Sequence, residues 1–92
     1  RFTLAQNYPN PFNPTSTIKF AIPQTAKVLL EVYNVLGQKV ADLVNQKLDA
    51  RYHSVKWNAV NNASGVYFYK LTATSENGKQ LFTSSRKMIL LK

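Results

Sequence analysis

Apolar and polar residues alternate along much of the chain, and this period of two is typical of β-strands with one buried face. Between residues 17 and 22, the side chains of Ile18, Phe20 and Ile22 share one face. The alternation returns in three further segments, at residues 27–34, 52–57 and 65–74. In the first, Val28, Leu30 and Val32 share the apolar side. The corresponding residues are His53, Val55 and Trp57 in the second segment, and Tyr67 and Tyr69 in the third. The pattern therefore predicts four strands in these segments.

Two segments give a weaker signal. A third strand is expected near residues 39–45, but Val40 and Val44 compete there with Ala41 and Leu43 for the apolar face, so a short helix is the alternative. We expect a loop over residues 47–51. The end of the chain, residues 80–92, predicts a last strand or pair of strands, and the apolar run at 88–91 indicates cover on both faces.

Turn residues separate these segments. Pro23 stops the first strand, Gly37 suits a positive φ, and Asn77-Gly78 predicts a type I′ hairpin turn. Six or seven short strands with no convincing long helix predict an all-β fold, an immunoglobulin-like antiparallel β-sandwich of about seven strands. In such a fold one of the two tyrosines at the start of the 65–74 strand, Tyr67 or Tyr69, resembles the tyrosine whose hydroxyl bonds back to the loop, and Trp57 joins it in the core.

The opening of the chain is rich in proline, with Pro9, Pro11 and Pro14 in close succession. Proline fixes φ, lacks an N–H donor and favours an extended residue before it. We therefore expect residues 1–14 to form an extended lead-in packed on the domain, and residues 15–92 to form the sandwich. Tyr8 and Phe12 should pack on the sandwich, and Asn10 or Asn13 should bond its backbone.

Size and charge narrow the classes of function. The 92 residues predict one small domain, and twelve basic against four acidic residues give a net charge of +8. The cations are dispersed along strands, so we expect a solvated basic face and no nucleic-acid partner. No apolar run approaches the roughly 20 residues of a membrane helix, so no membrane insertion is expected. The chain starts at Arg1 without a signal peptide, and we expect it to be a piece of a longer exported protein.

The residues offer little for catalysis. The acids are not closely spaced, and the single histidine, His53, is in phase with Val55 and Trp57, as expected of a partly buried structural histidine. There is no cysteine, so no disulfide or thiolate metal site is possible. We expect no enzyme, no cofactor and no transition metal; calcium bound by carbonyl and asparagine oxygens stays open. A sugar-stacking platform of Tyr52, Trp57, Tyr67, Phe68 and Tyr69 is the alternative to a core role for Trp57, Tyr67 and Tyr69. Phe68 and Tyr33 have the opposite phase, so we expect their rings to point outward.

Four motifs, taken in order, resemble a known family. They are the segments Asn7-Tyr8-Pro9-Asn10-Pro11-Phe12-Asn13-Pro14, Val32-Tyr33-Asn34-Val35-Leu36-Gly37-Gln38-Lys39-Val40, Ser64-Gly65-Val66-Tyr67-Phe68-Tyr69 and Lys87-Met88-Ile89-Leu90-Leu91-Lys92. Together they resemble the type A C-terminal sorting domains of proteins exported by the bacterial type IX secretion system. These domains are similar in turn to the immunoglobulin-like domain of flagellar hook-assembly proteins. The chain departs from the pattern at Arg51, where the family often has glycine.

The resemblance implies a secretion signal that carries an N-terminal cargo through the periplasm and across the outer membrane. The implied partners are the outer-membrane translocon and a sortase-like peptidase that cuts off the domain of some members, so that the cargo is joined to lipopolysaccharide. We expect recognition at the C-terminal edge, where an unpaired edge strand flanked by lysines accepts a partner strand. The alternative function is an accessory, binding or spacer module of a secreted polysaccharide-degrading enzyme. The candidate recognition residues are Lys87, Met88, Ile89, Leu90, Leu91 and Lys92; the motif residues with structural roles are Pro9, Asn10, Pro11, Phe12, Trp57, Gly65 and Tyr67.

Overall fold

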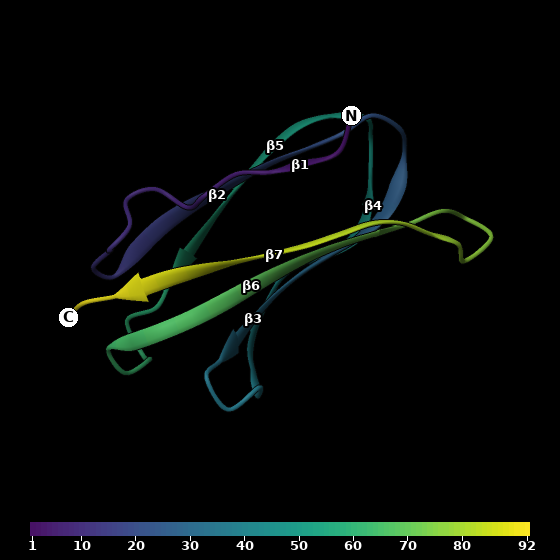
Figure 1. Ribbon diagram of the computed structural model, residues 1–92. Coiled ribbons are helices and arrows are strands. Elements are labelled where there is room, and N and C mark those ends of the chain that lie inside the picture. The colour runs from purple at the N-terminus through teal and green to yellow at the C-terminus, as the bar shows by residue number, and fades with distance from the viewer.

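The fold is a sandwich of two antiparallel β-sheets. The computed structural model describes residues 1–92 and contains no helix, hence none that could span a membrane. One sheet has three strands in the order β1-β2-β5, and the other has four in the order β4-β3-β6-β7 (Figure 1). The strands are β1 (Thr3–Leu4), β2 (Thr15–Ile22), β3 (Ala26–Asn34), β4 (Lys39–Leu48), β5 (Arg51–Asn58), β6 (Gly65–Thr74) and β7 (Gln80–Leu90). The predicted all-β sandwich of about seven strands is confirmed.

The core lies between the sheets and is filled by the apolar faces that alternation predicted. Ile18, Phe20 and Ile22 of β2 are buried, and so are Trp57, Tyr67 and Tyr69. The same holds for the predicted inward residues of β3, which are Val28, Leu30 and Val32. His53 is half-buried as expected, and its ring stacks on that of Phe20 with centroids 5.2 Å apart. The aromatic residues of β5 and β6, apart from Tyr52 and Phe68, are therefore core residues.

Strand β4 explains its own ambiguous pattern. Two bulges interrupt its pairing with β3. At the first, consecutive residues Leu30 and Glu31 face Val44 and Asp42, so one residue of β4 is skipped. At the second, Val32 and Tyr33 face Ala41 and Lys39. Each bulge inserts one extra residue and shifts the phase of the alternation. The helix alternative is wrong. The predicted loop over 47–51 is also wrong in extent, since only residues 49 and 50 separate β4 from β5.

Two hairpins share one turn design. In each, the amide of a glycine bonds the carbonyl three residues earlier: Gly37 to Asn34 at 3.0 Å, and Gly78 to Ser75 at 2.9 Å. The glycines have φ of +81° and +87°, as expected for Gly37. The type I′ turn predicted at Asn77-Gly78 is wrong, because that turn needs positive φ at both residues and no residue other than glycine has one.

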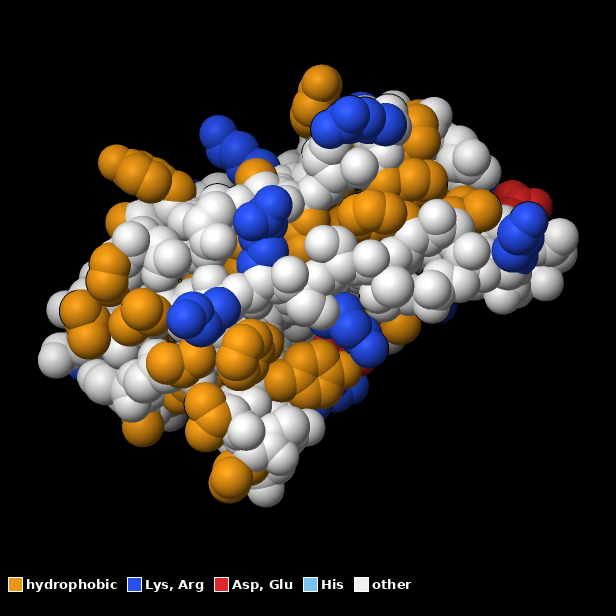
Figure 2. Space-filling view, in the orientation of Figure 1, with side chains coloured by type: hydrophobic (Ala, Val, Ile, Leu, Met, Phe, Trp, Pro, Cys, Tyr) orange, Lys and Arg blue, Asp and Glu red, His pale blue; other side chains and the backbone are white.

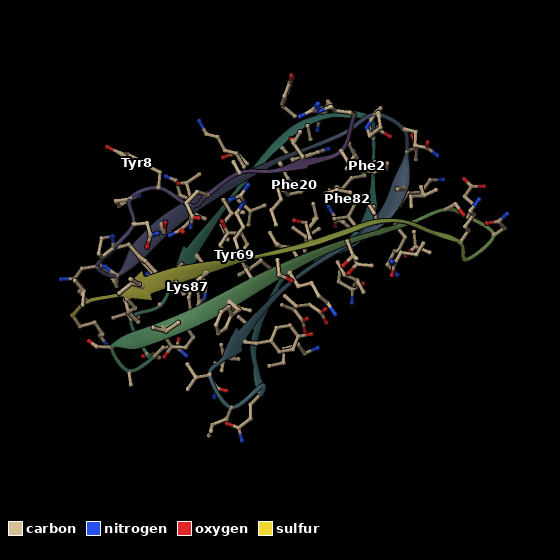
Figure 3. The ribbon with its side chains drawn as sticks, in the orientation of Figure 1. Phe2, Tyr8, Phe20, Tyr69, Phe82 and Lys87 are labelled. Atoms are coloured by element: carbon tan, nitrogen blue, oxygen red, sulfur yellow. The ribbon has the colours of Figure 1, made fainter.

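The N-terminal segment closes one side of the sandwich. Its strand β1 pairs with β2 in the three-stranded sheet, while Phe2 stacks on Phe82 of β7 with ring centroids 5.2 Å apart (Figure 3). Arg86 donates from Nε to the carbonyl of Leu4 at 2.7 Å. Tyr8, in contrast, is 81 % exposed, so the expectation that it packs on the sandwich is wrong. Its backbone pairs with Thr17, which turns the ring outward.

Candidate functional site

The four sequence motifs meet at one end of the sandwich, where the chain also ends (Figure 1). Phe12 forms an isolated parallel bridge with Leu90, and Leu90 pairs on its other side with Gly65. One cross-strand row runs through the other motifs, because Tyr33 pairs with Phe68 and Phe68 pairs with Lys87. Segments that are distant in sequence therefore build one continuous surface, and this surface is the candidate functional site.

The N-terminal segment occupies the edge of β7 at this end. The amide of Phe12 bonds the carbonyl of Ile89 at 3.0 Å, and the amide of Leu91 bonds the carbonyl of Phe12 at 3.0 Å. The outward amide of Ile89 bonds Oδ1 of Asn10 at 3.0 Å, and Gln6 donates to the carbonyl of Lys87 at 2.7 Å. The expected unpaired edge is therefore wrong between residues 87 and 91. A partner strand cannot add there while the lead-in is in place, since the carbonyl of Lys87, both backbone groups of Ile89 and the amide of Leu91 are already bonded.

The last strand divides its residues between the core and the surface. Met88 and Leu90 are fully buried, Ile89 is half-buried, and Lys87 is exposed. Leu91 lies beyond β7 and is 55 % exposed, so the expected cover on both faces is wrong. Only the alternate residues of this segment are available to a partner.

The two lysines of the last motif differ in their surroundings. Lys92 donates from Nζ to the carbonyls of Val60 and Asn62, at 2.6 and 2.8 Å. Its backbone amide bonds the hydroxyl of Ser64 at 2.9 Å. The ammonium of Lys87 forms no ion pair or hydrogen bond within the chain, so it alone is free to meet an acidic partner.

Lys87 stands among apolar side chains on the outer face of the four-stranded sheet. Phe68, its neighbour in the row, is 39 % exposed, which confirms the expectation of an outward ring. Figure 2 shows orange side chains gathered around a blue one over the ends of β3, β6 and β7. We call this surface the apolar patch; its residues are Tyr33, Val35, Leu36, Val66, Phe68, Ile89 and Leu91. Contiguous exposed apolar side chains on a small domain are typical of an interaction surface.

Comparison with protein families settles what kind of domain this is. Residues 6–89 match the family model described as "Secretion system C-terminal sorting domain". The chain belongs to this family. As a type IX sorting domain, it is part of a protein that is secreted across the outer membrane. The members of this domain family are sorting signals and are not catalytic.

The sorting domain was also compared with curated proteins and with solved structures. A search of curated proteins gave no match. Among solved structures, the crystal structure of CopC from Methylosinus trichosporium OB3b superposes with a TM-score of 0.59 at 14 % identity, over 98 % of this chain and 93 % of that one. At this identity the likeness concerns the fold alone.

A buried polar network holds the lead-in of the sorting domain to both sheets. The hydroxyl of Tyr69 donates to the carbonyl of Ala5 at 2.7 Å and accepts from the amide of Asn7 at 2.8 Å. Asn7 in turn donates from Nδ2 to the hydroxyl of Ser16 at 2.8 Å, and that hydroxyl donates to the carbonyl of Pro9 at 2.8 Å. Burial raises the pKa of the Tyr69 hydroxyl. Asn7 and Ser16 are the buried polar residues of the domain, and nothing in their sequence context distinguished them from exposed ones.

The aromatic motif residues pack directly beneath this end. The Trp57 ring lies 5.9 Å from that of Phe12 and 5.5 Å from that of Tyr67, measured between centroids. The Tyr67 hydroxyl bonds the carbonyl of Ala63 at 2.6 Å, which confirms the expected bond to the preceding loop. Pro9 and Pro11 are exposed, and Gly65 has φ of +150°. Asn10 bonds the backbone of β7, as expected for one of the two asparagines.

The acidic residues of the domain are mostly paired. Lys39 contacts Asp42 at 3.1 Å and Glu31 at 3.6 Å, and Lys47 contacts Glu76 at 3.1 Å. The hydrogen bond to Asp42 raises the pKa of Lys39. The structure contains no pocket and no group of three His, Cys, Asp or Glu side chains suited to a metal ion. What the surface offers is contact area and positive charge.

Proposed function

We propose that this domain directs an attached N-terminal cargo protein across the outer membrane by docking on the type IX translocon through the apolar patch and Lys87. The observation that carries the proposal is the position of Lys87, an unpaired cation on a face where the apolar side chains of three strands are exposed or half-buried. Of the six candidate residues at 87–92, Lys87, Ile89 and Leu91 make the contact. Met88 and Leu90 support it from the core, and Lys92 fixes the neighbouring loop.

The chemistry of the surface defines its partner. Burying Phe68, Leu91 and the turn residues Val35 and Leu36 gives affinity through the removal of apolar area from water. A free ammonium in the middle selects a receptor with a carboxylate at the matching place, and like charge there is rejected. The receptor on the translocon therefore presents an apolar surface with an acidic group.

The lead-in marks where the module begins. We take residues 1–14 as the lead-in and 15–92 as the sandwich, with the cargo attached ahead of the lead-in. Between Phe2 and Phe12 the lead-in is held by β2 and β7 in turn, so it is not free to enter a peptidase. A sortase-like peptidase that releases the cargo for surface anchoring would therefore cut before Phe2.

A secretion assay tests the proposal. Residues 1–92 are fused behind an inert periplasmic reporter in a bacterium with a type IX system, and the reporter is measured in the periplasm, on the surface and in the medium. The variants are Lys87→Glu and Leu91→Ser, and the matched control is Lys27→Glu, an exposed lysine on the same sheet at the far end of β3 from the apolar patch. We expect delivery by the unaltered fusion and the control, and periplasmic retention of the two variants.

Two results would contradict the proposal. Normal delivery of both Lys87→Glu and Leu91→Ser would remove the apolar patch from recognition. Retention of the unaltered fusion in the periplasm would instead favour the accessory or spacer role. Thermal unfolding of each purified variant distinguishes loss of recognition from loss of folding.

A further inference from the structure

Two tyrosines stand on the outer face of the three-stranded sheet, on the other side of the molecule from the apolar patch. Tyr8 is 81 % exposed and Tyr52 is 86 % exposed, and neither hydroxyl has a hydrogen-bond partner in the chain. Their partners in β2 are Thr17 and Ala21, which lie on the same face of that strand. Figure 3 shows Tyr8 pointing away from the body of the molecule. These two large aromatic rings take no part in the core, so packing does not explain their presence.

Lys19 lies between the two tyrosines. It is two residues beyond Thr17 and two before Ala21, so its side chain shares their face. Because Tyr8 and Tyr52 flank β2 on opposite sides, the three side chains form a diagonal. With about 3.3 Å per residue along a strand and about 4.8 Å between strands, each step is about 8 Å and the diagonal about 16 Å long. Lys56 of β5 pairs with Thr17 of β2 and adds a second cation next to this diagonal.

This face carries positive charge and no negative charge. None of the four acids lies in the lead-in, in β2 or in β5. Lys19 and Lys56 form no ion pair, since the salt bridges of the domain involve only Lys39 and Lys47. Figure 2 shows orange and blue side chains in turn along the upper edge of the molecule, where this face lies in profile. An anionic partner is therefore favoured.

We infer that this face binds a soluble acidic polysaccharide, a chain of sugars that carry carboxylates. The rings of Tyr8 and Tyr52 pack on the apolar faces of two sugars, and their hydroxyls bond sugar hydroxyls. Lys19 and Lys56 pair with the carboxylates between them. The residues between the tyrosines on this face are polar or small, such as Thr17 and Ser54, so the two rings stand apart and no continuous apolar surface joins them, as a membrane-inserting face would need. This role is independent of sorting, because it uses the opposite face.

Binding of the chain to polygalacturonate, measured by titration calorimetry, tests the inference. Dextran, a neutral polysaccharide, is the control ligand. The variants are the pair Tyr8→Ser with Tyr52→Ser and the pair Lys19→Gln with Lys56→Gln. The matched controls are Phe68→Ser for the loss of an exposed ring and Lys27→Gln with Lys70→Gln for the loss of two charges on the other sheet.

We expect polygalacturonate to bind and dextran not to bind measurably. Each variant pair should weaken binding about tenfold or more, which corresponds to about 1.4 kcal/mol, and the matched controls should change it less than about threefold. Equal weakening by both lysine pairs would reduce the effect to net charge and overturn the inference. So would full binding by the tyrosine pair, or equal binding of single-stranded DNA or of vesicles containing lipopolysaccharide through the same four residues.

Discussion

The backbone amide of Asn7 donates to the hydroxyl of Tyr69 over 2.8 Å, and this bond ties the lead-in to the middle of the four-stranded sheet. The two residues are 62 positions apart in sequence. The same hydroxyl donates to Ala5, so one side chain satisfies two backbone groups of the lead-in. The lead-in is therefore held from inside the sandwich as well as along the edge of β7.

Removing this hydroxyl should destabilise the domain. In Tyr69→Phe the buried amide of Asn7 loses its partner, and an unsatisfied buried group costs about 1–3 kcal/mol. Chemical denaturation measures the loss in the free energy of unfolding. Tyr52→Phe is the control: its hydroxyl is free, so we expect a change within about 0.5 kcal/mol. Equal stability of the two variants would show that the network contributes nothing.

The same hydroxyl should make stability depend on alkaline pH. Burial raises the pKa of Tyr69 above its ordinary value of 10.0. The folded chain then holds this proton to a higher pH than the unfolded chain. The stabilisation is complete below about pH 10 and is lost as the pH rises through the folded pKa. The difference in free energy of unfolding between the unaltered chain and Tyr69→Phe should therefore shrink as the pH rises above about 10; a difference that stays constant there would contradict this.

The sequence predicted the strands where alternation was regular. β2, β3 and β6 pack one face against the other sheet along their whole length, so the period of two survives in the residues. The prediction of β4 was ambiguous because two bulges, which are set by its pairing with β3, break the regular alternation of apolar and polar residues. The turn at Asn77-Gly78 was placed correctly and its type was wrong, since loop length depends on the bulge where β7 begins.

The surface was less predictable than the core. Tyr8 and Phe12 lie in the same proline-rich segment, yet one is exposed and the other is buried against Trp57. The difference arises because the lead-in crosses from β2 to β7, and neither pairing is local in sequence. The edge of β7 was expected to be open for the same reason. Contacts between the two ends of the chain leave no periodic signal in either one.

Phe12 should be a strong determinant of stability. Its ring is buried, and its backbone closes the edge of β7 through two hydrogen bonds. We expect Phe12→Ala to cost about 3 kcal/mol, measured by denaturant unfolding, because a large buried ring leaves a cavity. Tyr8→Ala, four residues earlier and exposed, should change stability by less than about 0.5 kcal/mol. A neutral Phe12→Ala would make the segment a linker.

Trp57 should be coupled to Phe12. Trp57→Ala alone should cost about 3–5 kcal/mol, because its buried ring contacts both Phe12 and Tyr67. The two rings contact each other, so the cost of the double variant should differ from the sum of the single costs by about 0.5–1.5 kcal/mol. A double-mutant cycle on the free energy of unfolding measures this term. Additive costs would show that the ring contact contributes only through burial.

Gly65 should resist substitution because of its backbone and not because of crowding. Its φ is +150°, whereas a Cβ added there would meet no atom within 4 Å. We expect Gly65→Ala to cost about 1–3 kcal/mol by denaturant unfolding, since side-chain-bearing residues rarely adopt this φ. Gly37 is the matched control: its φ of +81° lies near the left-handed region that asparagine tolerates. Gly37→Asn should therefore cost less than Gly65→Asn. Equal costs at the two positions would contradict the backbone explanation and assign the glycine of the third motif to contacts outside the domain.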